Sequence, residues 1–277
     1  MRYSPLFEVW EMVKPMILEV DFGNTRIKWR FIEPGSAAVQ AGHASSVSST
    51  VSGFLADLQG FQKPEQVRVA SVRKGDSLTE FNDWLRNIWG ISPRFATVTQ
   101  HCAGVTNSYA EVSRMGVDRW LAMLSAYNRS RGACIVVDGG TALTIDVLDA
   151  NGQHIGGYIL PGLALMAAAL EANTGIRLRS TDDQVTCRPG NSTEQAVYNG
   201  ALAAAVALIE KTHSAIAADM HPVATYLSGG DALELRACLD GLEEVNIVPD
   251  LVLDGLVLAC PEPTVESGAV DTDKLGH

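Results

Sequence analysis

Two segments of the chain place a carboxylate at the end of an apolar run, just before a turn that contains glycine and threonine. Ile17–Lys28 reads ILEVDFGNTRIK and Ile135–Asp146 reads IVVDGGTALTID, so Asp21 and Asp138 occupy equivalent positions. Glycine lets backbone amides approach an anion closely. Because a carboxylate beside a phosphate needs a cation between them, we expect Asp21 and Asp138 to hold Mg²⁺ with its waters, or a monovalent ion, next to polyphosphate. The repeat predicts a nucleotide site, although either turn alone is also typical of an ordinary hairpin.

Further residues and motifs limit which nucleotide-binding folds the chain could have. Asn24, Thr25 and Thr141 add short side-chain donors. The chain contains no GxxxxGK[ST] segment and no GxGxxG after a strand, which argues against a P-loop and against a dinucleotide-binding fold. A third glycine turn, Gly229–Asp231, follows the apolar run ATYLS. Its backbone could meet a base or a ribose, or it could be a plain connection from strand to helix.

An acid and a base stand side by side at the start of a predicted helix. The segment from Met115 to Trp120 reads MGVDRW, with Asp118 directly before Arg119. Asp118 could accept the proton of a substrate hydroxyl that attacks a γ-phosphoryl group, and Arg119 offers a fork of donors to a polar or anionic substrate. An Asp in a first helical turn also interacts favourably with the helix dipole without any catalytic role. The pattern thus fits phosphoryl transfer or a structural role.

Other catalytic chemistries find no support in the sequence. The six histidines form no HExxH pattern and no GxSxG segment is present, which argues against a metallohydrolase and a serine hydrolase. The five cysteines are odd in number and include no CxxC pair, so neither a disulfide framework nor a zinc site is predicted. A reducing cytoplasm is the simplest location for such a chain.

Composition limits both the size of the core and the class of partner. The chain has 277 residues, of which 47% are hydrophobic and 19% charged, enough for one large core or two modest ones. Its net charge of −11 is uneven, because residues 1–150 hold 15 basic and 15 acidic residues whereas residues 151–277 hold 6 and 17. Nucleic acid and anionic membranes both need a concentrated basic surface, so neither is expected as a partner. No 18-residue apolar run predicts a membrane span.

The elements that position these residues follow from hydrophobic periodicity and turn signals. Strands are predicted at Met16–Asp21, Arg26–Ile32, Val67–Val72, Arg94–Val98, Ala133–Val137, Ala142–Leu148, Gln153–Leu160 and Val223–Leu227, and helices at Val51–Leu58, Leu78–Trp89, Met115–Arg129 and Leu163–Ala172, from about Thr193, from Ala232 and after Pro249. Strict alternation predicts that Arg26–Ile32 is half-buried, with Arg30 on its polar face. Asn191 and Glu194 have capping-box spacing before the Ala-rich helix.

The repeat predicts two similar α/β halves packed face to face, with both turns lining one cleft. We expect an N-terminal extension at 1–15, a first domain at 16–114, a second domain at 115–261 that opens with the GVDR helix, and a disordered tail at 262–277. Met16 could itself be a start. Leu163–Leu170 and Ala201–Ile209 are typical of core helices or of helices that pack against a second subunit.

The ordered motifs of the chain resemble those of type III pantothenate kinases. They are DFGNTRIK at Asp21–Lys28, GVDR at Gly116–Arg119, DGGTA at Asp138–Ala142, GGYILPG at Gly156–Gly162 and SGGD at Ser228–Asp231. The similarity runs from Met16 to about Pro261, and the ordered set is far more specific than any one motif. The resemblance implies the actin, hexokinase and heat-shock ATPase superfamily fold, an α/β fold of two RNase H-like domains with ATP in the cleft between them.

The resemblance also implies an activity and a site. The activity is transfer of the ATP γ-phosphate to pantothenate, which gives 4′-phosphopantothenate in the first step of coenzyme A synthesis. Asp118 matches the family's base, and Asp138 matches the ligand of an activating monovalent cation, K⁺ or NH₄⁺, that acts beside Mg²⁺. The expected ATP-binding residues are Asp21, Phe22, Gly23, Asn24, Thr25, Arg26, Ile27, Lys28 and Thr141. The expected pantothenate-binding residues are Tyr109, Gly116, Val117, Asp118, Arg119 and Thr193, the last near a dimer interface.

These motifs lead us to expect a cytoplasmic, homodimeric pantothenate kinase. Two alternatives remain open. One is a regulatory or accessory factor of the same fold, since some relatives are described as accessory factors for transcription. The other is a different enzyme of the superfamily, such as a sugar kinase or an exopolyphosphatase.

Overall fold

The computed structural model describes residues 16–33, 45–48, 50–73, 75–180 and 184–260, so the predicted extension 1–15 and tail 262–277 lie outside the described residues. The strands are β1 (Ile17–Phe22), β2 (Ile27–Ile32), β3 (Ser45–Ser48), β4 (Gln66–Ser71), β5 (Arg94–Phe95), β6 (His101–Cys102), β7 (Val105–Thr106), β8 (Cys134–Gly139), β9 (Ala142–Leu148), β10 (His154–Pro161), β11 (Ala224–Gly229) and β12 (Val245–Ile247). The α-helices are α1 (Val51–Leu58), α2 (Asp76–Trp84), α3 (Val117–Ser130), α4 (Leu163–Asn173), α5 (Thr193–Ala217), α6 (Ala232–Arg236) and α7 (Leu251–Ala259). A π-helical turn (Leu85–Trp89) and a 3₁₀ turn (Val112–Arg114) complete the order.

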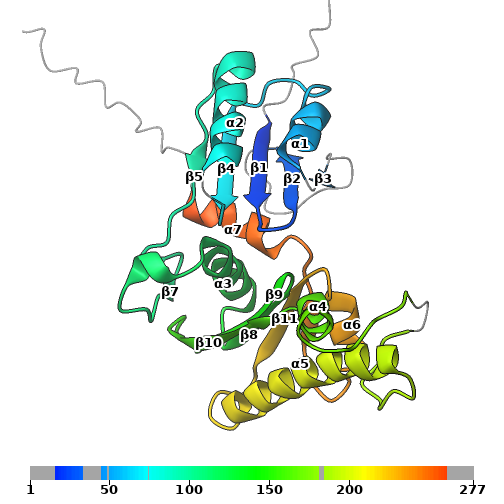
Figure 1. Ribbon diagram of the computed structural model, residues 1–277. Coiled ribbons are helices and arrows are strands. Elements are labelled where there is room, and N and C mark those ends of the chain that lie inside the picture. The colour runs from blue at the N-terminus through cyan, green and yellow to red at the C-terminus, as the bar shows by residue number, and fades with distance from the viewer. Residues whose placement is uncertain (1–15, 34–44, 49, 74, 181–183, 261–277) are drawn as a thin grey trace, which may run out of the picture.

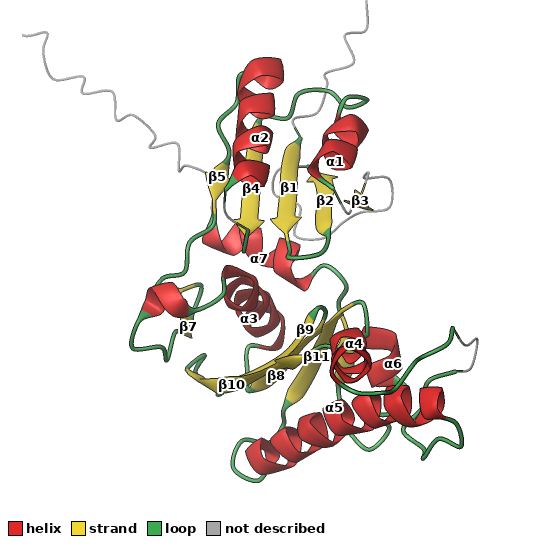
Figure 2. Ribbon diagram, viewed as in Figure 1, coloured by secondary structure: helices red, strands yellow, loops and turns green. Residues whose placement is uncertain are grey.

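The described residues form two five-stranded sheets with the same strand order, one above the other in Figures 1 and 2. The first sheet runs β3-β2-β1-β4-β5 and the second runs β10-β9-β8-β11-β12. In each, the central strand pairs antiparallel with the strand that follows it and parallel with the next strand along, β4 or β11. The predicted duplication is thereby confirmed, because Asp21 and Asp138 both lie at the C-terminal end of a central strand.

Each sheet has its own apolar core. In the first, Phe22 of β1 and Trp29 of β2 pack with Phe54 of α1 and Phe81 of α2. In the second, strands β8, β9 and β11 pack against α5 and α6 on one face and against α3 on the other. These aromatic and branched side chains satisfy both faces of the central strands, so the strands read as near-continuous apolar runs in the sequence.

Helices α3 and α7 pack against each other between the two sheets (Figure 1). They hold equivalent places at the end of the two repeated element series. Helix α7, from the end of the described chain, contacts β1 and β4 of the first sheet, and α3 contacts β8 and β9 of the second sheet as well as β4 of the first. The division expected at residue 115 stays a prediction, because these two helices connect both sheets.

Strand β2 departs from its predicted half-exposed character. Arg30 is only 3% exposed, and carboxylates from β1 and α7 meet it on the face of β2 that the alternation marked as polar. Its guanidinium donates to Glu19 at 2.8 Å through Nε and to Asp254 of α7 at 2.7 Å through Nη1. Alternation in the sequence shows which face of a strand is polar. It does not show whether oppositely charged side chains from other elements bury that face.

Two helix ends also differ from the prediction. The N-cap of α5 is Ser192, whose Oγ accepts the Gln195 N–H at 3.1 Å, so the predicted pair Asn191 and Glu194 is wrong by one residue. The Gln195 side chain also accepts the Asn191 N–H at 3.2 Å, from the residue that precedes the N-cap. The predicted helix Leu78–Trp89 ends as an α-helix at Trp84 and continues as the π-helical turn.

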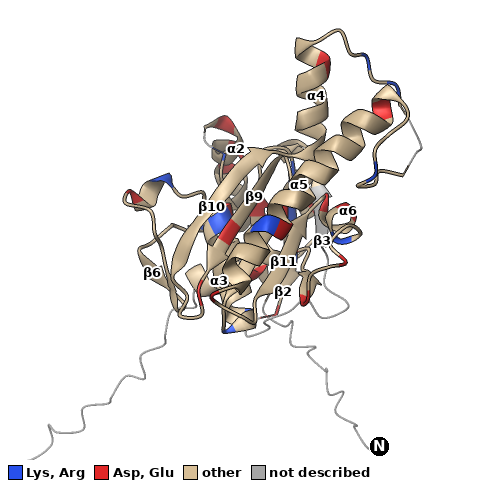
Figure 3. Ribbon diagram, turned by 90° about the horizontal axis from the view of Figure 1, so that it is seen from below, with Lys and Arg blue, Asp and Glu red and all other residues tan. Residues whose placement is uncertain are grey.

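Figure 3 shows acidic and basic residues on helices and on connecting loops of the described chain. None of the helices within the described ranges has both the length and the hydropathy needed to cross a bilayer.

Candidate active site

The two matched turns come together in space. Thr25 in the β1–β2 turn and Thr141 in the β8–β9 turn share a hydrogen bond of 2.7 Å between their Oγ1 atoms. The two hydroxyls are exposed, and the two residues are 116 positions apart in the chain. The repeat therefore places its two polar turns at one point between the sheets, as the sequence predicts.

Three carboxylates lie within electrostatic range of one another at this junction. Burial raises the pKa of Asp21 to about 7; the charge of Lys28 opposes this, and the charges of Asp118 and Asp138 add to it. Burial likewise raises the pKa of Asp138 to about 6, again against the charge of Lys28 and together with the charges of Asp118 and Asp231. Mutual repulsion of this kind is relieved by a bound cation, so the donor set fits a positively charged ion.

The described residues at this junction do not form a complete set of protein ligands for a metal ion. Among the residues described, no three His, Cys, Asp or Glu side chains converge as metal ligands. Mg²⁺ commonly takes one or two carboxylates and completes its shell with water and substrate phosphates. Asp21 and Asp138 fit that pattern, and each follows a buried central strand that holds its backbone in place.

Basic side chains surround the first turn. The Lys28 ammonium donates to the Pro249 carbonyl at 3.2 Å, which ties β2 to the residues before α7. Arg73, which the sequence reasoning missed, donates through Nε to the Gly23 carbonyl at 2.6 Å. The signal was available, because Arg73 follows β4, and Phe22 pairs with Ser71 across the parallel β1–β4 ladder. The Arg26 Nη1 lies 3.5 Å from the place that a Cβ on Gly230 would take, so Arg26 is close to the third glycine turn.

The third glycine turn, Gly229–Asp231, packs directly against Asp138 and Gly139. Gly229 has φ +90°, and an added Cβ would overlap the Gly139 backbone and the Asp138 carboxylate. The Asp231 N–H donates to the Gly139 carbonyl at 3.0 Å. Burial raises the pKa of Asp231, while a hydrogen bond from the Leu163 N–H at the start of α4 opposes that shift. The turn is thus part of the junction and more than a plain connection.

The GVDR segment begins α3. Gly116 is the N-cap, Val117 is the first helical residue, and the Asp118 Oδ1 accepts the Arg119 N–H at 2.8 Å. A Cβ on Gly116 would lie 2.5 Å from that oxygen, so glycine leaves room for the carboxylate. The Arg119 Nη1 donates to the Tyr109 Oη at 2.8 Å, and its guanidinium carbon lies 5.7 Å from the centre of the Tyr109 ring. The structure thereby joins two of the predicted pantothenate-binding residues.

The predicted site residues differ in whether their side chains are available at the junction of the two turns. Phe22 and Ile27 are fully buried in the first core, so only their backbone is available to a nucleotide. Asn24 is exposed in the turn. Thr193 is exposed at the start of α5, which packs on the face of the second sheet opposite to α3.

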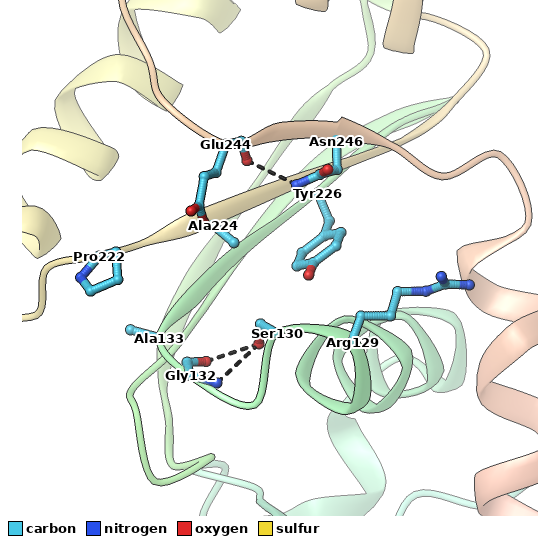
Figure 4. Close-up of a pocket in the computed structure, with 9 residues that line it drawn as sticks. All are labelled: Arg129, Ser130, Gly132, Ala133, Pro222, Ala224, Tyr226, Glu244 and Asn246. Carbon is cyan, nitrogen blue, oxygen red and sulfur yellow. Dashed lines mark hydrogen bonds between the residues drawn. The ribbon is translucent and has the colours of Figure 1, made fainter.

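A cavity of about 340 Å³ lies elsewhere, at the C-terminal end of α3 (Figure 4). Arg129, Ser130, Tyr226, Glu244 and Asn246 are among its lining residues. Figure 4 shows the Tyr226 phenol and the Arg129 side chain on neighbouring elements, β11 and α3. None of the residues that line it belongs to the predicted site, so this cavity is separate from the junction of the turns.

Comparison with known proteins decides the family. The sequence pattern described as type III pantothenate kinase matches residues 17–215. The chain belongs to the type III pantothenate kinase family. A type III pantothenate kinase from Pseudomonas aeruginosa (strain LESB58) is 36% identical over 252 residues, which cover 89% of this chain and 99% of that protein. One from Marinobacter nauticus is 36% identical over 243 residues, covering 87% and 96%.

Solved structures support the same fold for this family member. A Campylobacter jejuni protein assigned to the Baf family of transcriptional activators superposes with a TM-score of 0.54 at 20% identity, over 86% of this chain and 94% of that one. A Sinorhizobium meliloti protein named for 2-dehydro-3-deoxygalactonokinase gives 0.50 at 13% identity, over 87% and 96%. At these identities the likeness shows the fold alone. With the repeated sheets, it confirms the predicted duplicated ATPase fold.

Proposed function

We propose that this chain transfers the γ-phosphate of ATP to the hydroxyl of pantothenate, giving 4′-phosphopantothenate in the first step of coenzyme A synthesis. One observation carries the proposal: the two matched turns of a type III pantothenate kinase chain meet at the Thr25–Thr141 hydrogen bond of 2.7 Å. We place this reaction in the cytoplasm.

In this proposal the phosphates of ATP lie along residues 21–28 and against Thr141. Backbone amides of the glycine turns and the Thr25 and Thr141 hydroxyls donate to phosphate oxygens. The Lys28 ammonium, which already donates to the Pro249 carbonyl, supplies a positive charge from β2. Phe22 and Ile27 contribute through their backbone, since their side chains are buried.

Asp21 and Asp138 hold the cations. Burial first, and the charges of neighbouring carboxylates second, raise the pKa values of Asp21 and Asp138, and a bound cation would lower both by stabilising the ionised forms. Asp138 is the residue we assign to the monovalent cation, K⁺ or NH₄⁺. Bound Mg²⁺ offsets negative charge on the phosphoryl group during transfer.

Asp118 is the proposed base. Its Oδ1 is occupied by the Arg119 N–H at 2.8 Å, and among the described residues no protein donor is seen at Oδ2. That second oxygen is the one we assign to the pantothenate hydroxyl, whose proton it accepts as the hydroxyl attacks in line. Gly116 and Val117 fix the start of α3 and so the position of this carboxylate.

Pantothenate is a small anion, and Arg119 and Tyr109 are the pair we assign to it. The Arg119 guanidinium and the Tyr109 hydroxyl are held together at 2.8 Å beside Asp118. Thr193 lies on α5, on the other face of the second sheet, so we assign its contact to pantothenate bound by a second copy of the chain.

An exposed apolar surface supports such a dimer. β10 is an edge strand of its sheet, and Ile159 on it is 63% exposed. The neighbouring helix α4 is strongly apolar, but only Ala167 is buried on it, and Leu165 is 46% exposed. An edge strand and an apolar helix left uncovered are typical of an interface. Sedimentation should therefore find a dimer, and Ile159→Asp should shift it toward monomer.

The decisive experiment measures phosphopantothenate formation from ATP and pantothenate with Mg²⁺, with and without K⁺ or NH₄⁺. We expect product that depends on the monovalent ion, and we expect Asp118→Asn to lower kcat by about 10²- to 10⁴-fold, the usual contribution of a positioned base. Absence of product from wild-type protein, together with an unchanged Asp118→Asn variant, would disprove the assignment.

The two alternatives predict different binding. A regulatory protein of this fold would bind ligands without turnover, so calorimetry with ATP and pantothenate separates it from the kinase. The similarity to a Campylobacter jejuni protein assigned to transcriptional activators is confined to fold. A panel of sugars and polyphosphate tests for another activity of the superfamily.

A further inference from the structure

A buried chain of hydrogen bonds connects Arg119, a proposed pantothenate-binding residue, to Asp146, His154 and Ser108. The Asp146 carboxylate, 1% exposed on β9, accepts from Arg119 Nε at 2.9 Å and from Arg119 Nη2 at 2.6 Å. The His154 Nε2 lies 3.1 Å from Asp146 Oδ1, and the His154 Nδ1 lies 2.9 Å from the Ser108 Oγ. Neither Asp146 nor His154 has a role in the proposed chemistry.

Asp146 fixes the orientation of the Arg119 guanidinium. A two-point contact between a carboxylate and a guanidinium sets both direction and rotation, which a single hydrogen bond does not. The strand next to it is shaped around the pair, because a Cβ on Gly157 of β10 would lie 2.9 Å from Arg119 Nη2 and would crowd the Asp146 carboxylate. With Nε and Nη2 occupied, the Nη1 side of Arg119 remains beside Tyr109.

His154 contacts Asp146, the carboxylate partner of Arg119, and also contacts Tyr109. A carboxylate only accepts hydrogen bonds, so Nε2 carries the hydrogen that points to Asp146, and in the neutral ring Nδ1 accepts from the Ser108 hydroxyl. The same ring stacks on Tyr109, with centroids 6.1 Å apart and planes inclined by 27°. His154 thus touches the partner of Arg119 and the ring of Tyr109 at once.

Ser108, His154 and Asp146 also have the residue types of a nucleophilic triad. Two features oppose that role. Both Asp146 oxygens already accept from Arg119, and the His154 side chain is completely buried, so a substrate cannot reach the ring. The arrangement is suited to holding Arg119 and Tyr109 in place.

We propose that Asp146 and His154 are positioning residues for pantothenate, holding the Arg119 guanidinium and the Tyr109 hydroxyl in the orientation that binds it. This inference rests on the proposed function, because it assigns a role within the same site. It predicts that both side chains affect the use of pantothenate and leave the use of ATP unchanged.

Steady-state kinetics of Asp146→Asn and His154→Gln test this role. We expect KM for pantothenate to rise about 10- to 100-fold, the scale of a misplaced binding group, while KM for ATP changes less than about 2-fold. Matched controls are Asp240→Asn, whose side chain is 89% exposed, and His213→Gln on α5, and both should resemble wild type. Thermal unfolding of every variant establishes that it is folded.

A double-mutant cycle separates positioning from general loss of structure. If Asp146 acts through Arg119, then Asp146→Asn should add little to the rise in pantothenate KM caused by Arg119→Lys. Equal changes in both KM values, or additive effects in the cycle, would overturn the positioning role. An unchanged pantothenate KM in an active His154→Gln variant would overturn it for that residue. Wild-type protein that makes no phosphopantothenate would overturn the proposed function and this inference together.

Discussion

The hydroxyls of Thr25 and Thr141 are 2.7 Å apart, although one follows β1 and the other follows β8. This hydrogen bond connects the two repeated halves at the point where both turns present their donors. Because both hydroxyls are exposed, a phosphate group can take the place of either partner.

Removal of one of these hydroxyls should weaken ATP binding. We expect Thr25→Ala and Thr141→Ala each to raise KM for ATP by about 10-fold, since a hydrogen bond to a charged group contributes on the order of 1.5 kcal/mol or more. Thr25→Ser, which keeps the hydroxyl, should stay near wild type. The double variant tests coupling, because contacts to one shared phosphate give non-additive effects. Unchanged KM for ATP in both alanine variants would remove these hydroxyls from the site.

The raised pKa values of Asp21 and Asp138 predict the pH dependence of activity. Their values of about 7 and about 6 mean that both carboxylates take up protons as the pH falls through this range. A protonated carboxyl does not hold a cation, so kcat/KM for ATP with Mg²⁺ should fall as the pH decreases from about 8 to about 5.5. A flat profile over that range would contradict the assignment of these residues as cation ligands.

The same shifts affect the stability of the ligand-free protein, with the opposite sign. An Asp whose pKa is raised from 3.8 on folding binds protons more tightly in the folded state, so it stabilises the fold relatively at low pH. This contribution is complete below about pH 4 and is lost as the pH rises through about 6 and about 7. We expect Asp138→Asn to lose part of this slope in urea unfolding measured at several pH values, and Asp240→Asn to keep it.

Gly229 should not tolerate a side chain. Its φ of +90° favours glycine, and an added Cβ would overlap the Gly139 backbone and the Asp138 carboxylate. We expect Gly229→Ala to lower the free energy of unfolding by about 2 to 4 kcal/mol, through backbone strain and crowding together. Gly241→Ala is the matched control, because a Cβ added to Gly241 would meet nothing within 4 Å. Urea unfolding of the two variants would contradict this account if their stabilities were equal.

Asp254 of α7 should be important for joining the two sheets. It accepts from Arg30 of β2 at 2.7 Å and from Arg129 of α3 at 2.5 Å, and its side chain is 9% exposed. We expect Asp254→Asn to lower the free energy of unfolding by about 1.5 to 3 kcal/mol, because the buried Arg30 keeps Glu19 but loses the charge of its second carboxylate partner. Asp83→Asn breaks an exposed pair with Arg86 and should cost less than about 0.5 kcal/mol.

Much of the site follows from local sequence. The turns after Asp21 and Asp138, the start of α3 at Val117 and the strand Ala142–Leu148 depend on residues that are neighbours in the chain. Apolar periodicity and glycine position act over a few residues, so they are visible in a single sequence. The match between the two segments also indicated that both turns serve one cleft.

The sequence alone determined the two carboxylate turns, their duplication and the GVDR helix start, because backbone conformation there depends on nearby residues. Only the tertiary structure decided that Asp254 of α7 meets Arg30 of β2, and that Asp146 and His154 contact Arg119 and one another. Arg30 and Asp146 have the residue types of exposed positions, and their burial depends on partners from distant segments. Such partners are set by packing of whole elements, which no local pattern records.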